Sequence, residues 1–330
     1  MKTKIVYDIV SSLDDIYFEQ VWASAWTLKY YNPESYILLL TDQATYETIY
    51  TDVRSNSLNI IDEIQVINFD LPYSNKEKSR WIKTNLRNLV KGDFLFIDAD
   101  TIITGSLSTI DDIECSIGAV LDNHCRSSVI SDYPVFIDMY SDPFERFFGV
   151  KLKSETDVFN SGVLLVKDTP EAYKFFDSWH KNWLITREKG EVRDQLSMTY
   201  TNQELNYRIT EISGIYNCQI RVSVQYMFDA IIIHTFSHQN RDMISPLFGF
   251  QVYNNISKEK KITSDIAEQL LNCKRSFYSP TFLTDKRWMH IRFSPPYILL
   301  DRIIESTNIK GMLIFRIITL LSRILNRLLF

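Results

Sequence analysis

Glycine is scarce in this sequence, at 9 of 330 residues, and no Gly-rich phosphate-binding loop is present. A nucleotide, if one binds, must therefore be held in another way. Cysteine is scarce as well, and the thiols form no C-x-x-C pair, which argues against a zinc site or a disulfide framework and favours a reducing compartment. The four cysteines are Cys115, Cys125, Cys218 and Cys273.

Positive charge is not in excess. The formal net charge is −5 and the pI is about 5.6, so a nucleic-acid partner is not expected. No signal peptide is expected either, because Asp8 interrupts the apolar stretch that follows Lys2 and Lys4. The length favours about two domains, and we predict a catalytic domain over 1–240 and a C-terminal extension over 241–330.

Short apolar runs alternate with helical patterns over the first two thirds of the chain. This alternation predicts an α/β protein with a mixed, mostly parallel central sheet flanked by helices, followed by a C-terminal helical extension. The predicted strands are Ile5–Val10, Tyr36–Leu40, Ile64–Ile67, Phe94–Ile97, Ser116–Leu121, Val158–Lys167 and Ala230–His234. The predicted helices are Glu19–Tyr31, Gln43–Val53, Lys76–Leu89, Glu171–Leu184 and one that begins at Asp194.

Two carboxylates, Asp98 and Asp100, follow the apolar strand Phe94–Ile97. Neighbouring carboxylates repel each other and are costly to desolvate, and a divalent cation removes both penalties. Oxygen ligands suit Mg²⁺ or Mn²⁺, and ligands of open α/β sheets bind outside the carboxyl ends of the strands. The pattern therefore predicts a metal site. A solvated acidic pair is the alternative.

Four further polar clusters stand at ends or breaks of predicted elements: Ser11–Tyr17, Asn160-Ser161, Glu191–Gln195 and His234. Each also has a structural interpretation. Asn160-Ser161-Gly162 is typical of a β-bulge, and Asp194-Gln195 of a helix N-terminus. His234 at a strand end is typical of a hydrogen-bonded structural histidine.

The order of these clusters resembles glycosyltransferase family 8, the GT-A fold enzymes that include glycogenin and the lipopolysaccharide galactosyl- and glucosyltransferases. That family has a hydrophobic strand ending in D-x-D, then F-N-[SA]-G, then D-Q, then a strand ending in a metal-binding histidine, with an N-D-x-Y-like turn after its first strand. The matching stretches here are FLFIDADTII, Phe159–Leu165, Asp194-Gln195, Ile231–His234 and Asp14–Tyr17. The resemblance covers Lys4–Arg241.

The resemblance implies a role for each cluster. Asp98, Asp100 and His234 would hold Mn²⁺ or Mg²⁺, which in turn holds the donor diphosphate. The other residues would contact the donor or the reacting sugar: Ser11, Ser12 and Tyr17 at the base, Arg80 and Lys83 at the diphosphate or donor sugar, Asn160 and Ser161 beside the donor sugar, and Asp194, Gln195 and Glu191 at the reacting face. A solvated cationic helix face is the alternative for Arg80 and Lys83.

The last motif departs from the family pattern. The family has H-x-x-G-x-x-K-P-W, whereas His234 is followed here by TFSHQNR, without the Gly, Lys, Pro or Trp. Arg241 is the candidate substitute for the phosphate-binding lysine, and His238 competes with His234 as the third metal ligand. The family's retaining stereochemistry is therefore not carried over.

The implied function is transfer of a hexose from a nucleotide-diphosphate sugar, with a UDP-sugar favoured, to a glycan or lipid-linked saccharide in cell-surface polysaccharide synthesis. One alternative is a haloacid-dehalogenase-like phosphatase that uses Asp98 and Asp100. That fold places the motif on its first strand and wants glycine after the second aspartate, where this chain has Thr101. The non-enzymatic alternative is a catalytically degenerate, membrane-bound scaffold subunit.

The stretch from Ile309 to Phe330 is apolar and cationic, with no acidic residue. Its longest run without charge is six residues, too short to span a bilayer. A helix with an arginine stripe and a broad apolar face predicts an anchor in the plane of an anionic membrane surface, on the cytoplasmic face of the cell membrane. A helix packed on the catalytic domain is the alternative. The cations are Lys310, Arg316, Arg323 and Arg327.

Overall fold

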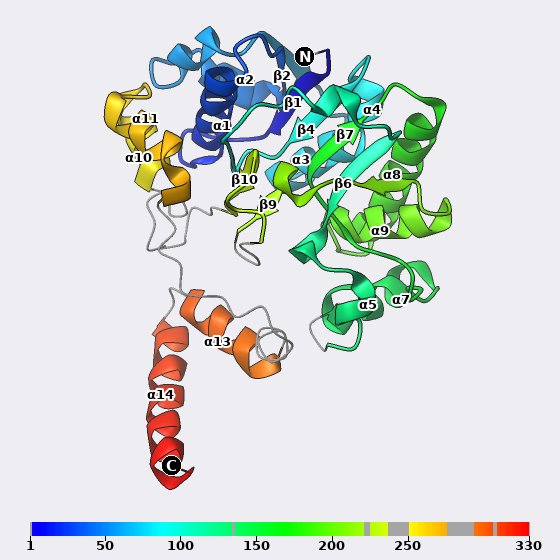
Figure 1. The fold of residues 1–330 in the computed structure, drawn as a ribbon, viewed down its shortest axis with the longest axis vertical. Helices are drawn as coiled ribbons and strands as arrows, with labels where there is room; N and C mark the ends of the chain where they lie inside the picture. Colours follow the sequence, from blue (N-terminus) through cyan, green and yellow to red (C-terminus); the bar gives the residue numbers. More distant parts are fainter. Residues whose placement is uncertain are drawn as a thin grey trace.

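The apolar runs of the sequence form one seven-stranded sheet in the computed structural model, which describes residues 2–133, 136–220, 225–236, 251–275, 294–305 and 309–329 (Figure 1). The strand order is β3-β2-β1-β4-β7-β6-β8. All neighbours are parallel except β7, which is antiparallel to β4 and β6. The strands are β1 (Lys4–Ile9), β2 (Ile37–Asp42), β3 (Glu63–Ile67), β4 (Phe94–Ile97), β6 (Ile117–Leu121), β7 (Phe159–Val166) and β8 (Ile209–Glu211). The predicted fold class, a mostly parallel sheet flanked by helices, is confirmed.

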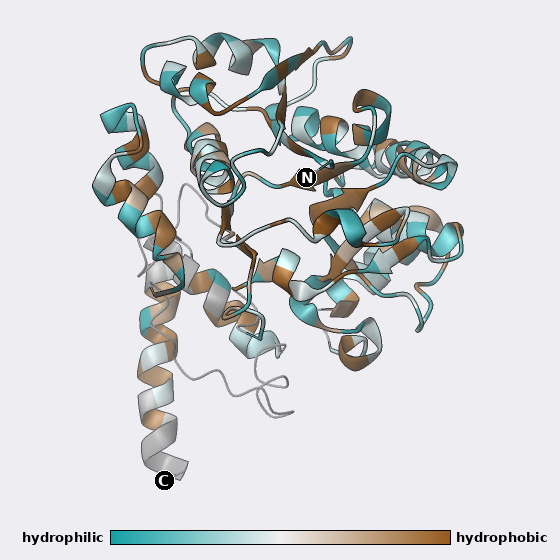
Figure 2. Ribbon diagram, turned by 45° about the horizontal axis from the view of Figure 1, so that its top comes forward, coloured by the Kyte–Doolittle hydropathy of each residue, from teal (hydrophilic) through white to brown (hydrophobic). Residues whose placement is uncertain are grey.

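Helices cover both faces of this sheet, and each face has its own apolar core. Strand residues alternate between the two cores, so that Ile5 and Tyr7 face one and Val6 the other. One face packs against α1 (Tyr17–Tyr31), and α10 (Gln251–Glu259) and α11 (Ser264–Leu271) pack in turn on α1. The opposite face packs against α3 (Asn75–Thr84), α4 (Leu86–Leu89), α8 (Pro170–Glu188) and α9 (Asp194–Glu204). Figure 2 shows the strands largely in apolar colours, whereas the helices carry both polar and apolar residues.

Two predicted helices are shorter than expected. The single helix predicted over Lys76–Leu89 is wrong, because it is interrupted at Asn85, where ψ is 9° and the backbone leaves the helical path. Asparagine competes with the helix through local hydrogen bonds, so a break at this residue is physically reasonable. The helix predicted over Gln43–Val53 ends as α2 (Gln43–Ile49).

A second, three-stranded sheet lies beside the first. Its order is β5-β10-β9, with β5 (Thr101–Ile103), β10 (Ile232–His234) and β9 (Cys218–Gln219). β10 is antiparallel to β5, and His234 stands opposite Thr101. This pairing places the end of β10 directly beside the aspartates that follow β4.

Short helical pieces make up the described part of the proline-containing segment before Gly149. A π-helical turn (Ile137–Ser141) leads into α7 (Asp142–Phe148), which ends at Gly149 with φ of +71°. Its aromatic side chains form a separate apolar cluster together with Leu196 of α9.

The C-terminal part contains α13 (Pro295–Glu305) and α14 (Ile309–Leu329), and α14 points away from the sheets (Figure 1). Several large apolar side chains of α14 are exposed. In the part of the chain that the structure describes, no helix has both the length and the apolar character that crossing a membrane requires. The exposed apolar residues of α14 are Leu313, Ile314, Phe315, Ile317, Leu320, Leu321 and Ile324.

Candidate active site

β2 and then β3 follow on one side of β1, whereas β4 pairs with the other side of β1. The direction in which strands are added to the main sheet therefore reverses between β1 and β4. Ligands of open α/β sheets bind in the crevice at such a reversal, outside the carboxyl ends of the strands. β1 ends at Ile9 and β4 at Ile97, so Asp98 stands at this crevice. β7 runs antiparallel to β4 with Val163 opposite Ile97, and its first residues, 159–162, therefore reach the same edge.

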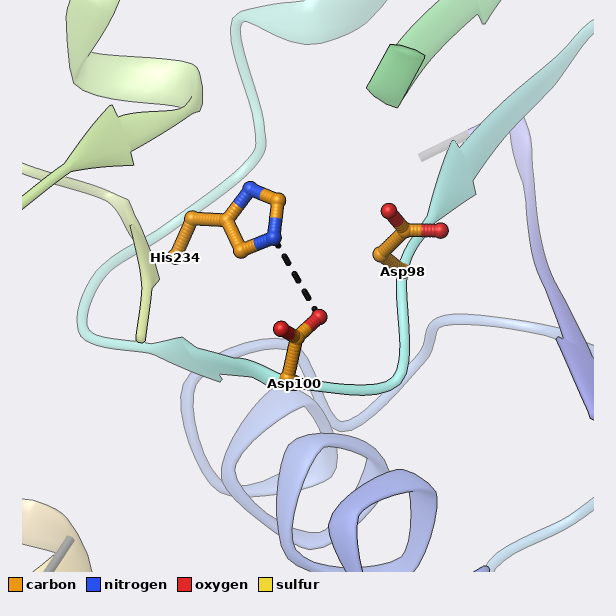
Figure 3. A group of neighbouring side chains, drawn as sticks. All are labelled: Asp98, Asp100 and His234. Atoms are coloured by element: carbon orange, nitrogen blue, oxygen red, sulfur yellow. Dashed lines mark ion pairs between the residues drawn. The ribbon is translucent and has the colours of Figure 1, made fainter. Parts of the chain in front are cut away.

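Three potential metal ligands meet at this edge (Figure 3). Asp98, Asp100 and His234 each offer one ligand atom, and these atoms all lie within 4.8 Å of one another. Nε2 of His234 is 3.2 Å from Oδ1 of Asp100, close to the ~3 Å between neighbouring ligands of an octahedral shell with ~2.1 Å bonds. Two carboxylates and one imidazole therefore fit Mn²⁺ or Mg²⁺ and leave coordination positions for oxygen atoms of a substrate.

Main-chain hydrogen bonds set the spacing of the three ligands. On one side, the backbone N–H of Asp98 donates to the carbonyl of Gly162 at 2.7 Å. On the other, the backbone N–H of Thr235 donates to the carbonyl of Asp100 at 2.9 Å and extends the pairing of β10 with β5. The two strands that flank the aspartates thus bring in both the glycine and the histidine.

Gly162 brings the backbone of β7 against the ligands. A Cβ atom at this position would lie 2.5 Å from Cε1 of His234 and 2.9 Å from Oδ2 of Asp98, so no side chain fits. The register of β6 and β7 also shifts here, as Ala119 pairs with Leu164 but Val120 with Asn160. The segment 160–162 thus lies at an irregularity of the strand pairing and also lines the cleft.

The imidazole of His234 is buried and held on several sides. Nδ1 lies 3.0 Å from Oδ1 of Asn217, and the ring of Phe236 stacks on the imidazole with centroids 4.0 Å apart. Burial favours the neutral ring, but the charge of Asp100 outweighs this effect and raises the pKa of His234 above 6.5. Burial likewise opposes ionisation of Asp100, yet its contacts with His234 leave the pKa of that carboxyl below 3.8.

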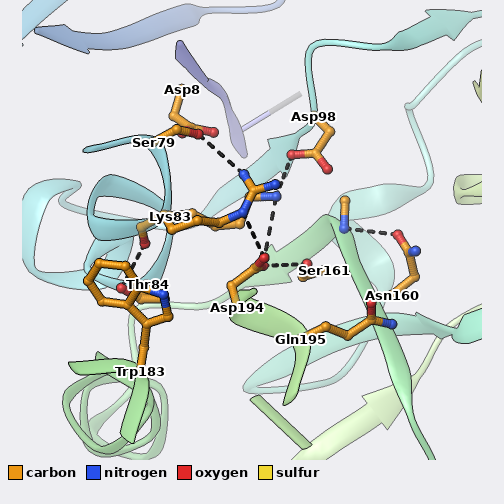
Figure 4. A network of polar contacts seen from close by, with 12 residues as sticks. Asp8, Ser79, Lys83, Thr84, Asp98, Asn160, Ser161, Trp183, Asp194 and Gln195 are labelled. Atoms are coloured by element: carbon orange, nitrogen blue, oxygen red, sulfur yellow. Dashed lines mark hydrogen bonds and ion pairs between the residues drawn. The ribbon is translucent and has the colours of Figure 1, made fainter. Parts of the chain in front are cut away.

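Two cations of α3 enter the cleft beside these ligands (Figure 4). Nζ of Lys83 lies 2.5 Å from Oδ1 of Asp98 and 4.0 Å from Oδ2 of Asp194. Nε of Arg80 forms an ion pair with Oδ1 of Asp194 at 2.9 Å, and the hydroxyl of Ser161 donates to Oδ2 at 2.6 Å. Burial opposes the charge of Asp194, but Arg80 and Lys83 outweigh it and lower its pKa. Lys83 is only 1% exposed, so a solvated cationic face does not describe it.

These groups line one cleft of about 680 Å³. Ten of the residues singled out by sequence lie in its wall, although they come from distant parts of the chain. They are Tyr17, Arg80, Lys83, Asp98, Asp100, Asn160, Ser161, Asp194, Gln195 and His234. His238 and Arg241 lie outside the described residues.

Ser11 and Ser12 are not in the wall of this cleft. Both hydroxyls donate to the carboxylate of Asp15, and the backbone carbonyl of Ser12 accepts from the buried Arg54. The two serines thereby hold the turn between β1 and α1, from which Tyr17 faces the cleft.

Glu191 also lies outside the cleft wall, where it forms a bidentate ion pair with Arg193. Burial opposes its charge, but the hydrogen bonds from Arg193 lower its pKa. Gln195 lines the cleft, and its amide donates to the backbone carbonyl of Phe159 at 3.1 Å. Asp194 is the first residue of α9, and it also lies in the cleft wall. A position at a helix N-terminus therefore does not exclude a role in the cleft.

Several residues of the site were not identified from the sequence, among them Asp8 and Asn217. Asp8 lines the cleft and accepts from the hydroxyl of Ser79 at 2.9 Å, and burial raises its pKa to about 6 despite the nearby Lys83 and Arg80. The charge within the apolar run of β1 was a usable signal for Asp8. Asn217, which contacts His234, lies in no apolar run or motif and had no such signal.

No protein-family model and no curated protein sequence matches this chain. The chain is similar in structure to mouse xyloside xylosyltransferase 1 (TM-score 0.45, 11% identity, covering 71% of this chain and 97% of that one). It is also similar to the glycosyltransferase GlyE of Streptococcus pneumoniae TIGR4 (TM-score 0.46, 16% identity, 85% of this chain and 66% of that one). A third similar structure is the galactosyltransferase LgtC in complex with donor and acceptor sugar analogs (TM-score 0.48, 11% identity, 81% of this chain and 100% of that one).

These solved structures are glycosyltransferases, the class whose motifs the sequence resembles. Similarity at this level does not carry a function from one protein to another. The function proposed below therefore rests on the geometry of the cleft.

The close approach at Gly162 gives a test of the metal site. Replacing Gly162 with alanine forces His234 or Asp98 to move, and we expect Mn²⁺ affinity to fall about 10–100-fold, the range found when the support of a ligand is disturbed. Titration calorimetry measures this. Gly105→Ala is the matched control, because its added Cβ would have no neighbour nearer than 3.6 Å. Equal Mn²⁺ affinity in the two variants would contradict the assigned geometry.

The raised pKa of Asp8 predicts a pH-dependent stability. Its folded pKa of about 6 exceeds the ordinary 3.8, so the folded protein binds the extra proton, and ionisation of Asp8 lowers the free energy of unfolding as pH rises between these values. In metal-free protein, Asp8→Asn should therefore be more stable than the parent at pH 7.5. That advantage should shrink toward pH 4.5 in urea unfolding.

Asp42→Asn is the control with the opposite sign. Burial alone would raise the pKa of Asp42, but hydrogen bonds from Lys78 and Thr45 lower it, so its charge stabilises the folded state at neutral pH. This variant should lose stability at pH 7.5. An Asp8→Asn variant that is less stable than the parent at pH 7.5 would refute the assignment for Asp8.

Proposed function

We propose that this protein is a metal-dependent glycosyltransferase of the GT-A type. It moves a hexose from a nucleotide-diphosphate sugar, with a UDP-sugar favoured, to a glycan or lipid-linked saccharide in cell-surface polysaccharide synthesis. The observation that carries the proposal is the meeting of Asp98, Asp100 and His234 at the reversal point of the sheet, beside the buried Lys83 and the partly buried Arg80. A divalent cation and fixed positive side chains of this kind stabilise the negative charge of a diphosphate group.

The position of two of the acidic groups supports the metal. Four carboxyl groups face the cleft, and its wall also contains four cations, Lys76, Arg80, Lys83 and Arg193. Asp98 and Asp100 lie together with His234, and a divalent cation bound among them would offset the repulsion between the two carboxylates. The four acids are Asp8, Asp98, Asp100 and Asp194, and Mn²⁺ or Mg²⁺ suits the mixture of carboxylates with one imidazole.

The donor is held by groups around the metal position. Lys83 and Arg80 supply positive charge where the diphosphate lies, and the ring of Tyr17 offers the base a stacking surface at the β1 end of the cleft. When bound, the cation neutralises the charge that develops on the leaving nucleoside diphosphate. Lys83 adds to this stabilisation, because its ammonium group is already buried and oriented by Asp98.

The sugar side of the cleft is polar. Ser161 and Asp194 are joined by a hydrogen bond, and Asn160 comes from the same bulge of β7. These groups and Gln195 offer donors and acceptors that match sugar hydroxyls and orient the transferred hexose. Asp194 keeps its negative charge beside Arg80, so it can stabilise positive charge that develops on the sugar.

The phosphatase alternative is not favoured by this arrangement. The aspartates follow β4 rather than the first strand, and Oδ1 of Asp98 is engaged by Lys83. The scaffold alternative predicts no nucleotide binding, which the following experiment tests.

Titration calorimetry with UDP should show binding that depends on Mn²⁺ and weakens at least about tenfold with EDTA, because the diphosphate then loses its cation. Asp100→Asn should lower transfer or hydrolysis of the active nucleotide-sugar by about 10²–10³-fold. Asp138→Asn, an exposed acid outside the cleft, is the matched control. Absence of UDP binding in the parent favours the scaffold, and metal-dependent release of phosphate from a phosphomonoester favours the phosphatase.

We also propose that α14 attaches the enzyme to the cytoplasmic face of the cell membrane, where a lipid-linked acceptor would be found. The support is a helix that exposes large apolar side chains and carries four cations without an acid. Each cation near an anionic surface contributes about 1 kcal/mol, and the apolar side chains enter the interface.

Sedimentation with phosphatidylserine-containing vesicles tests this attachment in the full-length chain. The parent should co-sediment, and less so in high salt, because salt screens the cations. The double variant Leu320→Glu, Leu321→Glu should stay in the supernatant, whereas Val129→Glu, at an exposed apolar residue near α7, should behave as the parent. Unchanged sedimentation of the double variant would argue for a helix with another partner.

A further inference from the structure

Asn217 contacts the edge of His234 that is turned away from the other metal ligands. Its Oδ1 lies 3.0 Å from Nδ1 of His234, while Nε2 of the same ring faces Asp100 at 3.2 Å. Asn217 is fully buried and directly precedes β9, which runs parallel to β10 and ends with Gln219 opposite His234. Its place in the fold is therefore fixed by the same small sheet that positions the histidine.

Asn217 is one member of a chain of hydrogen-bonded side chains. Its Nδ2 donates to Oδ1 of Asn160 at 2.9 Å, and Nδ2 of Asn160 donates to Oδ1 of Asp122 at 3.1 Å. The backbone N–H of Gly162 also donates to Oδ1 of Asn160, at 3.0 Å. The chain thus runs from the end of β6, through the bulge of β7, to the metal-binding edge of His234.

The direction of this chain is set by groups that can act in only one way. A backbone N–H only donates and a carboxylate only accepts, so Asn160 must turn Oδ1 to Gly162 and Nδ2 to Asp122. Oδ1 of Asn160 then requires a donor from Asn217, which leaves Oδ1 of Asn217 facing the imidazole. Nδ1 of His234 therefore faces an acceptor. Nε2 faces a second acceptor, the carboxylate of Asp100, and a cation bound between Nε2 and that carboxylate leaves the proton of the neutral ring on Nδ1.

The other contacts of Asp122 support this assignment. Its Oδ2 accepts from the hydroxyl of Tyr140 at 3.0 Å and from Nδ2 of Asn123 at 2.7 Å. With three donors directed at it, the carboxyl group is an acceptor throughout, and it terminates the chain. Tyr140 comes from the π-helical turn, so the aromatic cluster around α7 also contributes to the position of Asp122.

We propose that Asn217 is a positioning residue, which through Asn160 and Asp122 fixes His234 as the tautomer protonated on Nδ1. The lone pair of Nε2 is then available to a divalent cation, and the ring is held in the plane that presents it. A metal-bound histidine needs such an acceptor for its second nitrogen, and losing it weakens binding of the metal. The inference rests on the proposed function only in taking that cation to be the one that binds the donor diphosphate.

The tautomer can be measured in the metal-loaded protein. In protein labelled with ¹⁵N-histidine and loaded with diamagnetic Mg²⁺, a long-range ¹H–¹⁵N spectrum distinguishes the protonated from the unprotonated ring nitrogen, and His234→Gln assigns the signal. We expect the proton on Nδ1 in the parent and loss of this form in Asn217→Leu. A Mg²⁺-loaded parent whose ring is protonated on Nε2 overturns the proposal, and the parent spectrum decides even if the variant does not fold.

Mn²⁺ titration of the same proteins gives a second readout. Asn217→Leu should bind Mn²⁺ about 10–100-fold more weakly, whereas Asn217→Asp, which keeps an oxygen opposite Nδ1, should recover most of the affinity. Asn182→Leu is the matched control, since Asn182 is a buried asparagine that donates to Thr201 and Glu204 away from the cleft. It should lose stability without losing Mn²⁺ affinity.

The outcomes separate this proposal from the proposed function. If Asn217→Leu binds Mn²⁺ as the parent does while Asp98→Ala does not bind it, the positioning role is overturned and the metal site stands. If the parent binds neither Mn²⁺ nor Mg²⁺, the proposed function fails, and the metal-free spectra decide the inference about Asn217: Asn217→Leu should raise the share of the Nε2–H form, and equal shares in the two proteins overturn it.

Discussion

Repulsion between Asp98 and Asp100 is the interaction that the rest of the site is built to offset. Each carboxylate has its own basic partner: Lys83 contacts Asp98, and His234 contacts Asp100. Both basic side chains are almost fully buried, whereas 24% of the Asp98 side chain and 22% of that of Asp100 remain exposed, so solvent screens these contacts only in part. These contacts hold the two aspartates close together. A divalent ion would offset part of the same repulsion between them.

The fold brings these partners together through a single antiparallel strand. If β7 were parallel to β4, its bulge would lie at the opposite edge of the sheet, far from Asp98. Because β7 is antiparallel, Asn160, Ser161 and Gly162 meet the carboxyl end of β4. α3 packs on the same side and places Lys83 and Arg80 over that edge, where both reach Asp194 at the start of α9.

Much of this arrangement was predictable from the sequence, because strands and their polar ends have a strong local signature. Phe94–Ile97 was located without error, and the strand ending in His234 was located to within two residues. The break at Asn85 was missed, since the helical pattern continues across it. Ser12 and Glu191 are near cleft residues in the sequence, but neither lines the cleft in the structure. Each forms local hydrogen bonds that no periodic pattern reveals. Asn217 was beyond prediction, because its partners are brought to it by tertiary structure alone.

The short pairing of β10 with β5 has a consequence for how the protein is made. Thr235 follows Asp100 by 135 positions, and their contact closes a long loop of chain. During synthesis, the aspartates leave the ribosome well before the histidine, so the emerging chain carries only two of the three potential ligands. The proposed metal site is complete only after β10 has docked, and tight binding of an ion would then report that the tertiary structure is complete.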